Sequence, residues 1–204
     1  MNAIPSVFLA SRSLRRRELL HQIHVKFEVL LFRAESRVDG DVSEDLIAGE
    51  DAVHHVTRVA RAKAAAGVQR VMRRRLQSRP VLSADTTLEV DGAILGQPND
   101  DGEAAEMLRS LSGRRHRVLT AVALCDDERM ESLLSVSEVS FCRLTPEDIQ
   151  RYLASGEYRG KAGAYGIQGR AALFVEEIHG SYTGIMGLPL YETAQLLHKF
   201  GYPI

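Results

Sequence analysis

The alternation of apolar and polar residues predicts a strand, a helix and a second strand at the start of the chain. Residues 6–10 (SVFLA) form a short, mostly apolar run, which is typical of a buried strand. Ser13 can cap a helix over residues 14–23, whose leucines and isoleucine recur at the spacing of one helix face. Residues 25–31 (VKFEVLL) predict the second strand.

A polar, acidic stretch separates this unit from a long predicted helix. Residues 33–49 contain two glycines and several carboxylates, which predicts a loop or a mobile flap. The helix is expected over residues 50–75, with Val56 and Val59 on its inward face. Lys63 follows Val59 by four residues and should therefore lie close to that face.

The rest of the chain continues to mix strands with helices. Residues 80–84 predict a buried strand that ends at Asp85, and residues 88–95 predict a hairpin that turns at Asp91-Gly92. We expect, in chain order, a helix over 100–111, antiparallel strands over 115–125 and 129–143, a helix starting at Thr145-Pro146, a strand over 172–178 and a helix over 190–199. Because no repeat or linker interrupts this order, we predict one α/β domain over residues 1–204 with a central mixed sheet.

Composition and charge disfavour several classes of protein. The chain has 204 residues with 26 basic and 27 acidic side chains, and its net charge of −1 argues against nucleic-acid binding through bulk positive charge. Hydrophobic residues make up 45% and charged residues 26%, which is typical of a globular chain. No apolar run approaches the roughly 20 residues that span a bilayer. Two cysteines outside CxxC spacing indicate no disulfide framework, so a reducing, cytoplasmic location is expected.

Three polar segments follow predicted strands, where α/β folds tend to place ligands. The first is a strand-to-helix turn rich in hydroxyls and arginines, which suits an anion. Its candidate ligands are Ser11, Ser13, Arg15 and Arg16. Arg16 precedes Leu19 and Leu20 by about one helical turn, so it should point toward the strand end rather than into solvent. A plain helix cap with a solvated basic turn is the alternative.

The other two segments offer a carboxylate and a glycine-rich loop. Asp85, placed after a buried strand, suits a metal ion or a water to be deprotonated, and an Asx turn is the alternative. Residues 161–169 (KAGAYGIQG) carry a glycine at every third position, so the backbone can approach a ligand that Lys161 and Gln168 touch. A tight turn between core elements explains the same glycines. Lys63 is either a phosphate ligand or a lysine whose stem packs at the core edge.

Four ordered blocks resemble the signature motifs of the Maf family: LASRSLRRRELL, SADTTLEVDGAILGQPND, SGRRHRVLTAVAL and KAGAYGIQGRAALFVEEIHGSYTGIMGLPLYETAQLL. The resemblance covers nearly the whole chain, and the KAGAYGIQG and SADT blocks are more similar to the branch acting on dTTP and UTP than to the branch acting on 7-methyl-GTP. It implies a Maf/Ham1-type fold: an elongated mixed β-sheet flanked by helices, with two lobes sharing a cleft. It also implies a nucleoside triphosphate pyrophosphatase that needs Mg²⁺ or Mn²⁺ and often forms homodimers.

The resemblance also implies roles for individual residues. Asp85 matches the catalytic carboxylate and is expected to hold the metal together with Glu35. By position, Arg16 and Lys63 match residues that face the phosphates, and Ser11 and Ser13 match the first anion-binding turn. Thr86 and Gln168 match positions tied to base choice, and Lys161 matches the lysine that opens the last block. Gln97 departs from the pattern, because a lysine beside the phosphates usually precedes the proline there.

The sequence leaves other functions open. Gln97 and the altered acidic loop motivate a nucleotide-binding regulatory module with weak or no turnover. A pyrophosphatase acting on 7-methyl-GTP or another base is a further alternative. A nucleic-acid binder that uses the arginine runs is disfavoured by the near-zero net charge, and no membrane partner is expected.

Overall fold

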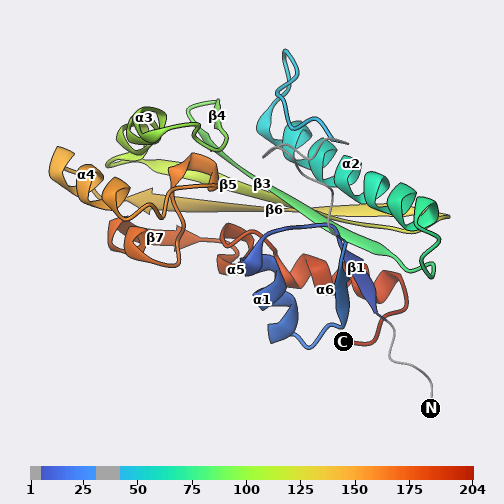
Figure 1. Cartoon of the computed structure of the whole chain (residues 1–204). Helices are drawn as coiled ribbons and strands as arrows, with labels where there is room; N and C mark the ends of the chain where they lie inside the picture. Colours follow the sequence, from blue (N-terminus) through green and yellow to red (C-terminus); the bar gives the residue numbers. More distant parts are fainter. Residues whose placement is uncertain (1–5, 31–41) are drawn as a thin grey trace.

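The computed structural model describes residues 6–30 and 42–204, and the strands of these ranges form one seven-stranded sheet (Figure 1). The strand order is β2-β1-β3-β5-β6-β7, and β4 pairs with β3 off this path. β1 is parallel to β2 and β3, whereas the other pairs are antiparallel, so the predicted mixed sheet is confirmed. The strands are β1 (Val7–Leu9), β2 (Phe27–Val29), β3 (Val81–Val90), β4 (Ala93–Leu95), β5 (Arg115–Cys125), β6 (Met130–Phe141) and β7 (Val175–His179).

Six α-helices accompany these strands in the described ranges, and most begin at a side-chain cap. Ser13, Asp51, Asp100 and Thr145 each accept a bond from a backbone N–H of the first turn, which stabilises those helix starts. The helices are α1 (Leu14–Gln22), α2 (Ala52–Arg73), α3 (Asp101–Leu111), α4 (Pro146–Ala154), α5 (Tyr182–Ile185) and α6 (Leu190–Lys199). None of these helices is long and apolar enough to cross a lipid bilayer.

Helices cover both faces of the sheet. α2 lies across one face, where Val56, Val59 and Ala60 are fully buried, while α1, α5 and α6 lie on the opposite face (Figure 1). The helix α2 approaches the sheet closely at Gly67, where a Cβ would stand 2.5 Å from Val81 Cγ1. Ser83 Oγ donates to the Ala60 carbonyl over 2.6 Å, which ties β3 to the same helix. β3 is therefore held in a fixed position below α2.

The structure corrects the predicted end of the third strand. β3 continues from Val81 to Val90, so Asp85 lies in the middle of a ten-residue strand and not after its end. Pairing with β5 along Val81–Glu89 explains the difference, because the antiparallel partner strand keeps the polar residues of SADTT in extended, paired backbone. The predicted turn at Asp91-Gly92 is confirmed, with φ angles of 49° and 81°.

Smaller differences occur near the C-terminus and after β2. Residues 170–174 form a 3₁₀ turn rather than the start of the predicted strand, and β7 begins at Val175. The one-turn helix α5 was not predicted. Of the loop predicted over 33–49, residues 33–41 lie outside the described residues, and residues 42–49 have no helix or strand.

Candidate active site

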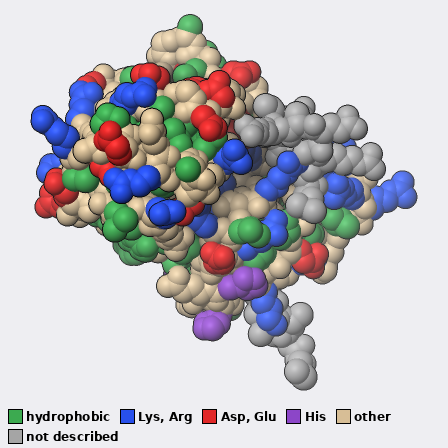
Figure 2. Space-filling model, turned by 60° about the vertical axis from the view of Figure 1, so that its left-hand side comes forward, with side chains coloured by type: hydrophobic (Ala, Val, Ile, Leu, Met, Phe, Trp, Pro, Cys, Tyr) green, Lys and Arg blue, Asp and Glu red, His purple; other side chains and the backbone are tan. Residues whose placement is uncertain are grey.

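A cleft of about 840 Å³ collects the polar segments singled out in the sequence. A volume of this size suits a nucleotide-sized ligand. In Figure 2, Lys and Arg side chains surround a hollow on the face shown. The sequence predictions that line the cleft are Ser11, Ser13, Arg15, Arg16, Lys63, Asp85, Thr86, Lys161 and Gln168.

The cleft includes a gap in the sheet along one edge of β3. β1 pairs with this strand only up to Leu82, and β4 begins to pair with it only at Leu88, so this edge stays open between them in the described residues. The Leu82 carbonyl accepts from Ala10 N–H of the first strand unit. Because successive backbone groups alternate in direction, Ala84 and Thr86 also turn their N–H and C=O groups toward this edge.

A lysine between two carboxylates forms the charged centre of the cleft. Lys63 Nζ lies 2.8 Å from Asp85 Oδ1 and 2.7 Å from Glu44 Oε1. The Lys63 and Asp85 side chains are each only 11% exposed, so this ion pair is shielded from water. Lys63 reaches it from the inward side of α2, as its spacing predicted, and Asp85 reaches it from β3. Two negative charges and one positive charge therefore meet at one point.

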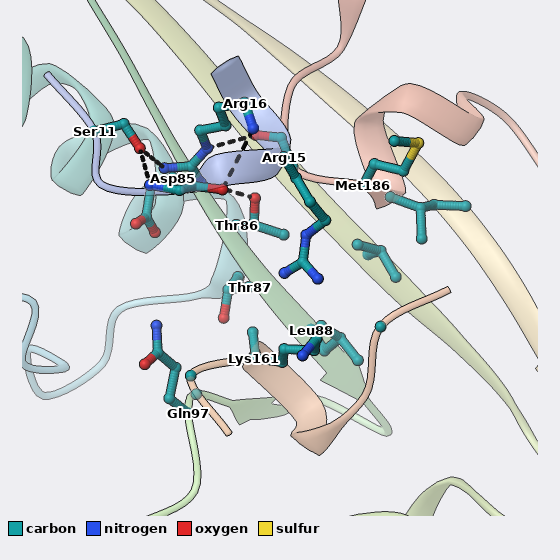
Figure 3. A pocket seen from close by; sticks show the side chains of 18 of the residues that line it. Ser11, Arg15, Arg16, Asp85, Thr86, Thr87, Leu88, Gln97, Lys161 and Met186 are labelled. Atoms are coloured by element: carbon teal, nitrogen blue, oxygen red, sulfur yellow. Dashed lines mark hydrogen bonds between the residues drawn. The ribbon is translucent and has the colours of Figure 1, made fainter. Parts of the chain in front are cut away.

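Arg16 ties three segments together at the floor of the cleft (Figure 3). Its Nε donates to the Gly187 carbonyl over 2.7 Å, and its two Nη atoms donate to Ser11 Oγ and Thr86 Oγ1, each over 3.3 Å. Burial lowers the pKa of Arg16 below its usual value, while the charges of Asp85 and Glu44 oppose that shift. Because protein acceptors engage all three nitrogens, Arg16 is oriented by the fold before any phosphate arrives.

The Thr86 hydroxyl belongs to the same network. Thr120 Oγ1 donates to the Gly184 carbonyl over 2.8 Å, and the two threonine hydroxyls are 3.0 Å apart. Since the Thr120 hydroxyl donates its hydrogen to the Gly184 carbonyl, the Thr86 hydroxyl is the donor between the two threonines. Thr86 Oγ1 also accepts a hydrogen bond from Arg16. The side chain that the resemblance ties to base choice thus has only one acceptor lone pair left for a ligand.

Two further cations come together at the opposite side of the cleft. Figure 3 shows the Arg15 guanidinium extending into the cleft, and Lys161 lies at its far side, where Lys161 Nζ donates to the Glu157 carbonyl. Burial, followed by the nearby charge of Arg15, lowers the pKa of Lys161. A Cβ on Gly166 would lie 2.7 Å from Lys161 Cε and 3.2 Å from Arg15 Nη1. Glycine at position 166 therefore leaves the space that these two cations occupy.

The other glycines of the 161–169 segment also make close approaches. Gly163 has a φ of 64°, and a Cβ there would overlap the Leu88 side chain. Gly163 N–H donates to the Gly96 carbonyl over 2.9 Å, which joins this segment to the loop that carries Gln97. Gly169 has a φ of 123°, and a Cβ there would overlap the Glu157 carboxylate. The regular glycine spacing thus reflects three separate packing demands.

The remaining wall of the cleft is apolar. Tyr165 contributes its ring, because its hydroxyl is bonded to buried His116 Nε2 over 2.8 Å. Burial lowers the pKa of His116 to about 4, so this imidazole is neutral at physiological pH. The apolar lining includes Leu88, Val118, Tyr165, Ile167, Ile185 and Met186. An apolar wall beside a cationic centre suits a ligand with a flat ring at one end and negative charge at the other.

The second carboxylate on Lys63, beside that of Asp85, belongs to a residue that the sequence prediction missed. Glu35, the expected second metal ligand, lies outside the described residues. Among the described residues, Glu44 lies in the cleft lining and against Lys63. Its position in an irregular segment left no periodicity to find it by, and the only signal was a run of acidic residues shortly before the helix that carries Lys63.

The chemistry of this donor set can be compared with what a divalent ion needs. No cluster of three or more His, Cys, Asp or Glu side chains that could hold an ion occurs in residues 6–30 and 42–204. Asp85 and Glu44 do converge on one ammonium group, so two carboxylates are close enough to share a cation. Mg²⁺ is commonly held by one or two carboxylates together with substrate phosphates. The pair therefore fits an ion that arrives with a polyphosphate.

Comparison with known proteins connects this cleft to a family. The model of the family described as "Maf-like protein" matches residues 6–200. The dTTP/UTP pyrophosphatase of Aromatoleum aromaticum is 59% identical over 199 residues, covering 97% of each chain. The dTTP/UTP pyrophosphatase of Dechloromonas aromatica is 53% identical over 196 residues, covering 96% of this chain and 98% of its own. The Ham1 protein of Staphylococcus aureus shares the fold, with a TM-score of 0.50 at 14% identity over 96% of this chain and 97% of its own.

Proposed function

The chain belongs to the family of Maf-like proteins, and from that premise we propose that it hydrolyses dTTP and UTP to the nucleoside monophosphate and pyrophosphate. One observation carries the proposal: a single cleft holds the Asp85–Lys63–Glu44 centre, the Arg15–Lys161 cations and an apolar wall. The high identity to relatives named dTTP/UTP pyrophosphatase, over almost the full length of both chains, supports the same reaction.

Asp85 is the proposed catalytic carboxylate. A water beside it attacks the α-phosphorus, and the Asp85 carboxylate takes the proton that the water loses. The new P–O bond forms to the water oxygen while the bond from the α-phosphorus to the bridging oxygen breaks. The electron pair of that bond leaves with pyrophosphate. Mid-strand placement of Asp85 and its contact with Lys63 hold the carboxylate in one orientation during this step.

The positive side chains of the cleft are proposed to balance the negative charge of the substrate. A nucleoside triphosphate carries about four negative charges, so its binding requires several positive groups close together. Arg15 and Lys161 are proposed to bind the phosphate chain, since Arg15 extends into the cleft and burial, which lowers the pKa of Lys161, makes the Lys161 charge costly without an anion. Lys63 would contact the same chain from the side of Asp85. Ser11, Ser13 and Arg16 shape the turn at the floor.

A divalent metal ion is part of the proposal. Asp85 and Glu44 would hold Mg²⁺ or Mn²⁺, because their carboxylates meet at Lys63 Nζ and offer oxygen ligands. When bound, such an ion neutralises charge on the phosphate oxygens and makes the phosphorus a better electrophile. Glu35 remains a proposed ligand from the family resemblance alone.

The base is proposed to lie against the apolar wall. Leu88, Ile185 and Met186 offer contact area for a pyrimidine ring, and Gln168 supplies a neutral amide for its polar edge. The two cysteines are free thiols, which supports the cytoplasm as the proposed compartment. The homodimer stays a prediction.

A nucleotide panel tests the proposed function. The purified protein is incubated with dTTP, UTP, CTP, ATP and 7-methyl-GTP in the presence of Mg²⁺ or Mn²⁺, and products are separated by ion-exchange chromatography. We expect monophosphate and pyrophosphate, fastest from dTTP and UTP. Diphosphate with inorganic phosphate would show a different reaction. Binding without product would favour the regulatory module, and preference for 7-methyl-GTP would favour the other branch of the family.

A further inference from the structure

The segment that brings Glu44 to the cleft has no secondary structure of its own. Residues 43–47 contain no helix or strand, yet Glu44 Oε1 is placed 2.7 Å from Lys63 Nζ. A side chain on such a segment is ordered only if other contacts fix its backbone. Two of these contacts come from one residue of α2.

Arg58 holds the backbone on both sides of Glu44. Its Nη2 donates to the Asp45 carbonyl over 2.9 Å, and its Nη1 donates to the Ser43 carbonyl over 3.4 Å. These two carbonyls belong to the residues immediately before and after Glu44. A single guanidinium therefore bonds to the backbone on both sides of the acidic side chain.

The Arg58 guanidinium is itself fixed by Glu50. Nε of Arg58 lies 2.6 Å from Glu50 Oε1, and Nη2 lies 2.8 Å from Oε2, which is a two-pronged pairing. The Glu50 side chain is 8% exposed and also accepts from Ile47 N–H over 3.3 Å. Hydrogen bonding by Arg58 lowers the pKa of Glu50 to about 2, so Glu50 stays charged across the working pH range. His55 Nδ1 lies 3.2 Å from the same carboxylate.

These contacts are not needed to start the helix. The N-cap of α2 is Asp51, whose Oδ1 accepts from His54 N–H over 2.8 Å. The Arg58 side chain is also about a third exposed. Besides its contacts with Glu50 and His55, its bonds go to the Ser43 and Asp45 carbonyls, so this side chain helps to place the segment that carries Glu44.

We propose that Arg58, oriented by Glu50, is a positioning residue that sets Glu44 beside Lys63 and Asp85 for the reaction. The effect on the reaction rate rests on the proposed function, whereas the effect on the backbone around Glu44 rests on the described contacts alone. A lysine cannot replace Arg58, because one ammonium group cannot bond to both prongs of Glu50 and to two separate carbonyls at once.

A double-mutant cycle with Glu44 provides the kinetic test. The variants are Arg58→Met, Arg58→Lys, Glu44→Gln and the double variant Arg58→Met with Glu44→Gln, assayed with dTTP and UTP. We expect Arg58→Met to lower kcat roughly 10- to 100-fold with little change in KM, since misplacing a catalytic group by about 1 Å costs a similar factor. The double variant should be no slower than Glu44→Gln alone.

The matched control is Arg61→Met on the same helix. Arg61 donates to Ser132 Oγ and lies outside the cleft lining, so its loss should leave the rate unchanged. Losses in the double variant that multiply those of the two single variants would overturn the proposal. So would a wild-type rate in Arg58→Lys, because positive charge alone would then suffice.

Hydrogen exchange provides a readout that needs no activity. We expect amides of residues 42–50 to exchange faster in Arg58→Met and in Glu50→Gln than in the wild type, with unchanged exchange in β3. Unchanged protection of residues 42–50 would overturn the proposal. If the wild type hydrolyses no nucleotide, the proposed function fails, and the exchange data still decide whether Arg58 holds this segment.

Discussion

The substitution Asp85→Asn tests the proposed reaction most directly. Asparagine keeps the shape of the side chain and removes its negative charge. Its carbonyl oxygen can still accept from Lys63, which now lies 2.8 Å from Asp85 Oδ1. What the variant loses is the group that takes a proton from water.

The structure predicts a modest effect on folding. Breaking a buried ion pair costs about 3–5 kcal/mol when the other charge is left alone. Here Lys63 keeps Glu44 as a partner at 2.7 Å, so we expect a loss of only about 1–2 kcal/mol. For a chain of 204 residues that corresponds to a fall in Tm of roughly 2–8 °C.

The predicted effect on turnover is much larger. Loss of a positioned proton acceptor typically lowers a rate by about 10²- to 10⁴-fold, which corresponds to about 3–5 kcal/mol of barrier. Pyrophosphate release from dTTP and thermal unfolding would be measured on the same preparation. Glu89→Gln is the matched control, because Glu89 lies on β3 outside the cleft lining and pairs with Arg117 at 2.6 Å.

Two results would refute the reasoning. Turnover of a well-folded Asp85→Asn within tenfold of the wild type would remove Asp85 from the proton transfer. An equal loss in Glu89→Gln would show that any charge removed from β3 disturbs the site, and the role of Asp85 would then be structural.

Three further predictions concern other parts of the cleft and its support. Gln97→Lys should raise kcat/KM several-fold, because it adds a cation at the cleft lining; an unchanged or lower value in steady-state kinetics would show that Gln97 is no deficit. The unfolded chain protonates His116 near pH 6.5 and the folded chain only near pH 4, so unfolding free energy should fall by about 3 kcal/mol as pH drops through that window. His116→Phe should flatten this slope in urea titrations, and a slope that persists would assign it to another group. Gly163→Ala should cost about 2–4 kcal/mol in urea unfolding, from its positive φ and from overlap with Leu88, and a loss below about 0.5 kcal/mol would contradict the close packing.

Local patterns predicted most of the elements because their signals are contained within a few residues. Ser13, with the apolar stripe after it, marked α1, and Thr145-Pro146 marked the start of α4. The end of β3 was predicted wrongly, because a polar run looks like a loop until the partner strand is known. The short helix α5 has no room for a periodic pattern.

The sequence predicted those site residues whose position follows from spacing within one helix or strand. Lys63 was placed near the inward side of α2 by counting from Val59, and the structure has it at the cleft. The engagement of Arg16 by the Gly187 carbonyl could not be foreseen, since these residues are 171 positions apart. Glu44 was missed for a similar reason, because Lys63, which it contacts, and Arg58, which bonds to the residues on either side of it, both lie on the helix that follows.

Within the part of the chain that the structure describes, the edge of β3 at Ala84 and Thr86 has no partner strand, and this affects how ligand contacts in the cleft can be identified. Main-chain groups remain when a side chain is replaced, so an alanine scan is blind to any bond that a ligand makes to them. Chemically modified ligands can test bonds to these main-chain groups instead. A UTP analogue methylated at ring nitrogen 3 lacks the donor that uracil and thymine share, and it would show whether that donor matters. A base preference that survives every side-chain change in the cleft would thus point to the backbone of this strand.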